Sequence, residues 1–267
     1  MNTAPTTAYA SAAGHYGFRQ AARMEWIKLR SLRSTTYALL LTVVAMIAMG
    51  VVTMANTKAP HGASKVASFD PTNNVLAGVA LGQLVVGVLG VLLVTGEYSS
   101  GTIRATLAAV PDRRLALTAK AAVFGGAALL VGEVVALVTF VAGVAALSPD
   151  VPHPSLGDPA VLRAVLMAGA YLAMVALMGI GIGAITRHTA SAIGVFVGIT
   201  YVLPALLAGT TGTGVAKFFP TMIAGNSLAV TVPVDSMLTP WAGCAVLCLY
   251  TAALLAVGGR LLVRRDA

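Results

Sequence analysis

The sequence predicts an all-α polytopic membrane protein with six transmembrane helices. Hydrophobic residues make up 58% of the 267 residues and charged residues only 10%, against about 25% charged residues in soluble domains. So few polar residues cannot cover a water-soluble body of this size. Six apolar stretches qualify as spans, because about 20 apolar residues cross a hydrocarbon layer about 30 Å thick. They are residues 37–55, 75–96, 121–147, 161–186, 190–208 and 241–259.

Each stretch is expected to be a helix rather than a strand. Lipid cannot satisfy free backbone groups, and the stretches exceed the length of a barrel strand. Residues 17–267 are therefore interpreted as one six-span domain. Residues 1–16 are small and polar, with little to bury, and are expected to be a disordered tail.

The positions of lysine and arginine predict the orientation in the membrane. The formal net charge is +8, and 13 basic residues fall on one side of the six spans against four on the other. Basic residues concentrate on the cytoplasmic side of membrane proteins. The protein is therefore expected to be a multi-pass protein of the cell (plasma) membrane with both termini in the cytoplasm. The basic residues form short clusters between apolar runs, so nucleic acid is not an expected partner. The four on the other side are Lys58, Lys65, Arg163 and Lys217.

Residues 17–34 predict an amphipathic helix that lies at the membrane surface before the first span. Glu25 falls within its apolar arc, where Lys28 or a partner from another element would lower the cost of placing a carboxylate. A segment that only fixes topology remains the alternative. The expected apolar face consists of Phe18, Ala22, Trp26, Leu29 and Leu32, beside a stripe of Arg19, Arg23 and Arg30.

The loop after the second span predicts a short cytoplasmic amphipathic helix. Ser99 or Ser100 is the candidate N-cap, and Pro111 ends the pattern. An apolar stripe recurs at helical spacing at Ile103, Leu107 and Val110. A helix of about two turns is unstable alone, so this stripe must pack on its own bundle or in a groove of a soluble partner.

These two segments resemble the permease (transmembrane) subunits of type-two ABC exporters, especially those of actinobacteria. The motifs are EWIKLRS at residues 25–31 and EYSSGTIRATLAAVP at residues 97–111. The resemblance implies that the first is the connecting helix, with Glu25, Trp26, Lys28 and Arg30. It implies that the second contains the coupling helix, which docks on an ATPase subunit through Glu97, Gly101, Thr102, Ile103, Arg104, Leu107, Arg113 and Arg114. The alternative is that Arg104, Arg113 and Arg114 only set topology and contact lipid phosphates. From proximity alone, Glu97 is expected to hold this helix through Arg104.

The segment KFFPTMIAGNS at residues 217–227 is similar to the extracellular re-entrant segment of that family. The loop at residues 209–240 is long and apolar, and residues 215–219 and 222–232 are expected to form two short helices interrupted by Pro220 and Gly225. The candidate outer gate consists of Phe218, Phe219, Pro220 and Asn226. An interfacial loop without a gating role is the alternative.

The chain contains no G-x-x-x-x-G-K-[ST] phosphate loop, so it is not expected to be an enzyme. No catalytic, cofactor-binding or metal-binding residue is expected in it. The resemblance implies a separate soluble ATPase subunit that binds ATP and Mg, and a second permease copy, identical or different, with the substrate path between the two permeases. Membrane lipids are the remaining expected partner.

Glu133 is the one ionisable residue expected deep inside a span, the third. Such a carboxylate is costly and turns toward protein or water. It is interpreted either as a neutral or hydrogen-bonded structural residue, or as a residue that lines the substrate path or the dimer seam. An ion-driven secondary transporter or channel is the alternative function, but Glu133 has no deep Lys or Arg to match it.

Overall fold

The computed structural model describes residues 17–31, 33–59, 69–230 and 236–265, and its regular elements within these ranges are all helical. This confirms the predicted fold class. The expected N-terminal tail, Leu32 and Lys65 lie outside the described residues. In chain order the elements are α1 (Phe18–Ser31), α2 (Arg33–Ala55), α4 (Pro71–Val75), η1 (Leu76–Gly78), α5 (Val79–Ser99), α6 (Ile103–Ala109), α7 (Arg113–Ala145), α8 (Pro159–Thr186), α9 (Thr189–Val197), η2 (Gly198–Val202), α10 (Leu203–Thr211), α11 (Thr213–Ala216), α12 (Pro220–Ser227) and α13 (Pro240–Arg264).

Six helical stretches of the described residues are long and apolar enough to cross a membrane, which confirms the six predicted spans. Several begin earlier than the apolar sequence does, because a cap rather than the lipid boundary sets the helix end. The third span begins at Arg113, where Asp112 Oδ1 accepts hydrogen bonds from the amides of Arg114 and Leu115 at 2.9 and 3.2 Å. The spans are Thr35–Ala55, Pro71–Ser99, Arg113–Ala145, Pro159–Thr186, Thr189–Thr210 and Pro240–Arg264.

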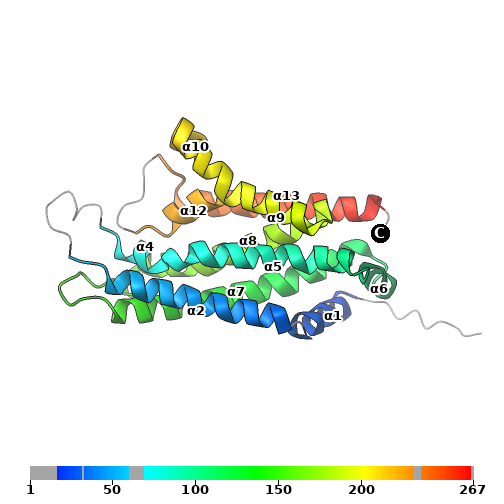
Figure 1. Cartoon of the computed structure of the whole chain (residues 1–267), viewed down its shortest axis with the longest axis horizontal. Helices are drawn as coiled ribbons and strands as arrows, with labels where there is room; N and C mark the ends of the chain where they lie inside the picture. The colour runs from blue at the N-terminus through cyan, green and yellow to red at the C-terminus, as the bar shows by residue number, and fades with distance from the viewer. Residues whose placement is uncertain (1–16, 32, 60–68, 231–235, 266–267) are drawn as a thin grey trace, which may run out of the picture.

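The helix α8 forms the centre of the bundle and packs along α5, α7 and α13 (Figure 1). Of its most apolar stretch, 78% is buried, against 22% in α2 and in α13. The contact between α5 and α8 depends on glycine, since an ideal Cβ at Gly179 would lie 2.2 Å from the carbonyl oxygen of Gly87. Close backbone approach of this kind is what small residues provide between helices in lipid.

The fifth span is bent. A π-helical turn, η2, separates α9 from α10, and α10 leaves the bundle at an angle (Figure 1). π-helical turns and prolines are the usual causes of such kinks, and Pro204 follows directly in α10. Val195, Val202 and Leu206 are exposed along this span, so no described part of the chain covers that face.

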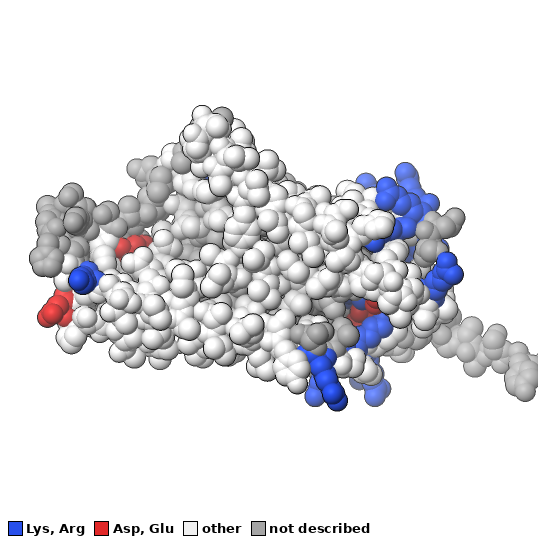
Figure 2. Space-filling view, viewed as in Figure 1, with Lys and Arg blue, Asp and Glu red and all other residues white. Residues whose placement is uncertain are grey.

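The two ends of the bundle differ in charge. Lysine and arginine gather at the end that holds α1, α6 and the last turn of α13, which we name the basic end (Figure 2). The other end, where α4 and α12 lie, is named the opposite end (Figure 1). This asymmetry follows the expected topology. Which end faces the cytoplasm remains a prediction.

Candidate functional site

Four charged side chains from three helices meet at the basic end. We name them the charge cluster: Glu25 and Lys28 of α1, Glu97 of α5 and Lys120 of α7. Lys120 Nζ lies 2.6 Å from Glu25 Oε2 and 2.8 Å from Glu97 Oε1. Lys28 Nζ lies 2.9 Å from Glu97 Oε1 and 3.2 Å from Glu25 Oε1. Each ammonium group therefore contacts both carboxylates.

The cluster also contacts α6. Lys28 Nζ donates a hydrogen bond to Thr106 Oγ1 at 2.9 Å, so a single ammonium group joins α1, α5 and α6. Ile103 and Val110 of the predicted apolar stripe are buried against the bundle, as is Thr106, and Leu107 is half-buried. The apolar stripe of α6 thus packs on its own chain, which is one of the two outcomes expected from the sequence. Arg104, Ala105, Ala108 and Ala109 form the exposed face of α6.

Burial makes the charge cluster a paired unit. Glu25 and Lys120 are 4% and 8% exposed, and two buried charges of this kind are stable only when each is paired and hydrogen-bonded. With two lysines and two glutamates the cluster is formally neutral. Burial acts to lower the pKa of Lys28, but the hydrogen bond that Lys28 donates to Glu97 and the charges of Glu25 and Glu97 outweigh it, so the pKa of Lys28 is raised. Lys28 is therefore protonated at neutral pH.

The sequence left open whether Glu25 pairs with Lys28 or with a residue of another element, and the structure shows both pairs. Glu25 pairs with Lys28 at i+3 and with Lys120 of another element. The face of α1 that contacts the bundle differs from the expected apolar arc, because Ala21 and Glu25 are buried whereas Phe18 and Trp26 are 49% and 46% exposed. The helix α1 thus uses its charged face against α7 and leaves its aromatic face uncovered.

The expected contact between Glu97 and Arg104 is not formed. Glu97 pairs with the two lysines instead, and Arg104 is exposed. Arg104 follows the buried Ile103, and one residue along a helix rotates the side chain by about 100°, which carries Arg104 away from the bundle. The expected serine N-cap is also wrong: α5 continues to Ser99, and the N-cap of α6 is Thr102.

The remaining residues predicted to dock on the ATPase subunit have different surroundings. Gly101 adopts a positive φ of 73° in the turn between α5 and α6, a conformation that glycine allows. Arg113 Nη1 donates to the carbonyl oxygens of Leu262 and Arg265 at 2.9 and 2.8 Å, so it holds the C-terminal end of α13 and is not a free docking charge. Arg114 is exposed, and Arg30 lies over the ring of Trp26, 5.9 Å from its centroid.

Sequence reasoning missed Lys120 and Thr106 as site residues. Lys120 counted only among the basic residues that set topology. A signal for it was present, because the carboxylate of Glu25 in an apolar arc requires a cation, and Lys120 directly precedes the third apolar stretch. Thr106 carried no such signal, since its role depends on how α6 turns after Gly101.

At the opposite end, α12 is held by hydrogen bonds to neighbouring elements. Arg163 Nη1 of α8 donates to the carbonyl oxygen of Ser227 at 2.8 Å, and Asn226 Nδ2 donates to that of Leu238 at 2.9 Å. The expected short helices at residues 215–219 and 222–232 correspond to α11 at Thr213–Ala216 and α12 at Pro220–Ser227, and residues 231 and 232 lie outside the described residues. Pro220 begins α12, as proline does at the first position of a helix, and α12 continues through Gly225 without a break.

The predicted outer-gate residues do not share one environment. Phe218 is 39% exposed and lies between α11 and α12, whereas Pro220 and Asn226 are buried. Phe219 is intermediate and is the N-cap of α12. Of these four residues, only Phe218 is exposed at the surface.

A buried polar network lies behind α12, and it was not predicted from the sequence. Gln83 of α5 is 1% exposed and accepts a hydrogen bond from the hydroxyl of Tyr171 of α8. Its amide donates to Thr221 Oγ1 of α12 at 3.5 Å, and Thr221 in turn donates to the carbonyl oxygen of Thr200 in the π-helical turn. This network connects α5, α8, α12 and the bend of the fifth span.

Glu133 lies at the contact between α7 and α8 and is half-buried. An ideal Cβ at Gly169 would lie 2.4 Å from the carboxyl carbon of Glu133, so that glycine provides the space for the side chain. Its Oε2 atom is buried without a hydrogen-bond partner among the described residues. The proposed role of Glu133 in the substrate path or the dimer seam stays a prediction.

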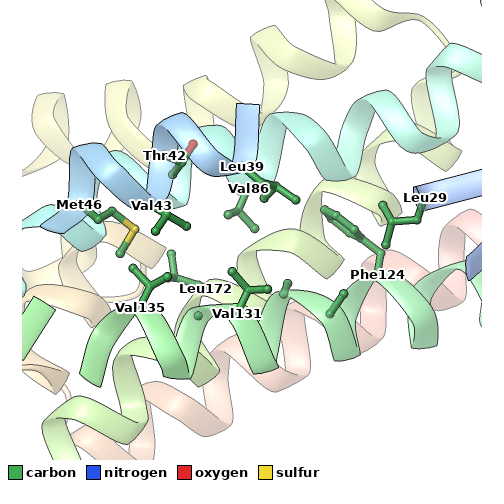
Figure 3. A pocket seen from close by; sticks show the side chains of 13 residues that line it. Leu29, Leu39, Thr42, Val43, Met46, Val86, Phe124, Val131, Val135 and Leu172 are labelled. Atoms are coloured by element: carbon green, nitrogen blue, oxygen red, sulfur yellow. The ribbon is translucent and has the colours of Figure 1, made fainter. Parts of the chain in front are cut away.

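An apolar cavity of about 50 Å³ lies between α2, α5, α7 and α8. Val131 and Val135 of α7 face Val43 and Met46 of α2 across it (Figure 3). Cavities of this size with apolar walls stay dry. Among the described residues, no group of three or more His, Cys, Asp or Glu side chains is placed to hold a metal ion.

Residues 21–205 match a family model described as "ABC-2 family transporter protein". No curated protein sequence matches the chain. The matched region begins in α1 and ends in α10, so it contains the whole charge cluster, α6 and the first five spans.

Proposed function

The chain belongs to the ABC-2 transporter family, whose membrane components carry no ATPase of their own, and we propose that it forms the translocation path of an ATP-driven exporter. In this proposal a soluble ATPase subunit that binds ATP and Mg docks on the basic end, which faces the cytoplasm together with both termini. A second permease copy completes the path.

The position of α6 carries this proposal. Its inward face is anchored by Ile103, Thr106 and Val110, while its outward face presents Arg104 between small alanines at the end of the bundle. A short helix that is fixed on one side and open on the other offers a partner a firm surface. Lys28 then links any movement of α6 to the charge cluster.

The charge cluster explains how α1, α5 and α7 would rearrange without leaving a buried charge unpaired. Because each lysine contacts both glutamates, a rotation of α1 against α7 exchanges one ion pair for another. Two helix arrangements can then differ little in free energy, and binding of ATP by the partner would shift the population between them.

The proposed second copy would cover the faces that this chain leaves open. Tyr37, Leu41 and Val44 on α2 are 69%, 71% and 62% exposed, and the bent fifth span exposes Leu206. We place the substrate path between these faces of the two copies. In this arrangement Phe218 and α12 form the outer gate, which the network of Gln83 and Thr221 connects to the bend of the fifth span.

Co-expression with a soluble ABC ATPase subunit from the same organism tests the proposal. Arg104→Glu is expected to weaken co-purification by at least about tenfold. In this proposal Arg104 pairs with carboxylates of the ATPase subunit, and the reversed charge would repel them. Ala108→Trp is expected to block docking sterically. Arg33→Glu is the matched control, since Arg33 is exposed at the same end but lies outside α6.

Lys28→Met separates docking from coupling. It is expected to leave co-purification intact and to abolish the stimulation of ATPase activity by transport substrate. Unchanged association in both α6 variants would reject docking at α6. Flux driven by an ion gradient in liposomes that contain this chain alone would favour the ion-driven transporter instead.

A further inference from the structure

A wide groove lies between α1 and α7, which contact each other through the charge cluster. Its volume is about 1000 Å³. The wall formed by α1 carries Arg19, Arg23 and Trp26, and the wall formed by α7 carries Val123, Gly126 and Leu130. The groove is therefore basic along one side and apolar along the other.

The two arginines lie on successive turns of α1, so their guanidinium groups face the same side of the helix. Neither forms an ion pair with a carboxylate among the residues that the structure describes. The nearest acidic residue in sequence, Glu25, is already occupied by Lys28 and Lys120. The basic wall thus carries two positive charges that no described side chain neutralises.

The apolar wall has an open floor. An ideal Cβ at Gly126 would meet no atom within 4 Å, so the glycine leaves free space rather than serving a helix contact. Ala127 and Val131 line both this groove and the apolar cavity between α2 and α7. The floor therefore continues inward along α7 as apolar surface.

We propose that this groove binds one anionic phospholipid. The phosphate lies between Arg19 and Arg23, since guanidinium groups donate paired hydrogen bonds to phosphate oxygens. Trp26 lies at the level of the headgroup, where aromatic residues concentrate in membrane proteins. One acyl chain lies over Gly126 and follows α7 into the bilayer. This site requires only that the helices span the membrane, and it does not depend on docking of an ATPase.

Fluorescence quenching of Trp26 tests the site directly. The chain has two tryptophans, and Trp26 is the sole one in the variant Trp241→Phe. This variant is reconstituted into dioleoyl-phosphatidylcholine vesicles with a small, equal fraction of brominated phosphatidylglycerol or brominated phosphatidylcholine. We expect brominated phosphatidylglycerol to quench Trp26 several-fold more effectively. Arg19→Gln and Arg23→Gln are each expected to lower this preference by on the order of fivefold.

Gly126→Leu distinguishes a built site from general attraction to a basic surface. It fills the floor from a position where an added Cβ meets no atom within 4 Å and leaves both arginines in place, and it is expected to abolish the preference. Gly194→Leu, at another glycine with open space, and Arg33→Gln, at another exposed arginine, are expected to preserve it. In the reciprocal variant Trp26→Phe, Trp241 at the opposite end is expected to show no preference.

Equal quenching of Trp26 by the two brominated lipids would overturn the proposal. A preference that survives Gly126→Leu would equally overturn it, because the arginines alone would then account for the binding. The assay contains no ATPase, so its failure leaves the proposed docking at α6 untouched.

Discussion

The charge cluster at the basic end and the end of α12 at the opposite end are both held by polar contacts, but of different kinds. In the charge cluster, side chains pair with side chains: Lys28 and Lys120 each contact Glu25 and Glu97. The contacts that fix the end of α12 run from side chains to backbone. Arg163 binds carbonyl oxygens at the end of α12, and Asp70 Oδ2 accepts a hydrogen bond from the amide of Val230 at 2.6 Å.

The difference indicates different mechanical properties. A backbone carbonyl has a fixed position in its helix, so Arg163 holds α12 in one place relative to α8. Each of the four charged side chains of the cluster contacts two partners, so they can exchange partners while remaining paired. The charge cluster is therefore suited to movement between helices, and the contacts of Arg163 to holding α12 until the helices behind it move.

The largest effect is expected from Lys120→Met. This change removes the α7 cation that pairs with Glu25. The carboxylate of Glu25, which is 4% exposed, then keeps only its ion pair with Lys28. Breaking a buried ion pair from one side costs about 3–5 kcal/mol. A fall of this size in the free energy of unfolding should be measurable by denaturant unfolding in detergent.

Two further variants sharpen this prediction. Lys28→Met should cost less, because Lys28 is 34% exposed and Lys120 still contacts both glutamates. The double change Lys120→Met with Glu25→Gln should recover part of the loss, since it removes the uncompensated charge. If Lys120→Met were as stable as the natural sequence, the charge cluster would not hold α1 on α7.

A smaller effect is expected at the other network. Tyr171→Phe removes the hydroxyl that donates to Gln83 Oε1 and leaves a buried acceptor unsatisfied. The cost of such an atom is about 1–3 kcal/mol. Gln83→Leu combined with Tyr171→Phe should be milder than the single change, because both polar partners are then absent. A thermal-unfolding series in detergent tests whether Tyr171→Phe alone is less stable than the double variant. A double variant that is equally or less stable would contradict the prediction.

Thr106→Val tests the contact between α6 and the charge cluster. Valine keeps the shape of the side chain but accepts no hydrogen bond from Lys28. A loss of about 1 kcal/mol is expected, and it should be local to α6. Amide hydrogen exchange of residues 103–109 should accelerate while that of α8 stays unchanged. Uniform acceleration across the bundle would show instead that Thr106 supports the fold as a whole.

The spans could be predicted from the sequence because the membrane sets their length and composition. The apolar stretches therefore located all six, and only their ends shifted where Asp112 and other caps extend a helix beyond the apolar residues. The apolar stripe of α6 was also predictable, since Ile103 and Val110 follow helical spacing. These features depend on local sequence and on the solvent.

The partners within the charge cluster were not predictable in the same way. Glu25 and Lys120 are 95 residues apart, and nothing local indicates that α1 crosses α7 at that point. Proximity along the chain favoured Arg104 as the partner of Glu97, but the turn at Gly101 and the phase of α6 carry Arg104 outward. The network of Gln83 and Tyr171 could not be predicted for the same reason. Each residue alone resembles an ordinary polar residue in an apolar helix, and the two come together only when α5 packs on α8.

The smallest effect concerns pH. The pKa of Lys28 is raised from its usual value of 10.5, because the charges and hydrogen bonds of the two glutamates outweigh the effect of burial. The folded state therefore holds this proton more tightly than the unfolded state does. The resulting stabilisation is complete below the unfolded-state pKa and is lost as the pH rises through the raised folded-state pKa. Because Lys28 is partly exposed, the effect should be below about 1 kcal/mol. Comparing the thermal midpoints of the natural sequence and of Lys28→Met between about pH 9 and about pH 11.5 isolates it. The natural sequence should lose more stability than the variant across this range, and parallel curves would mean that Lys28 contributes nothing through its charge.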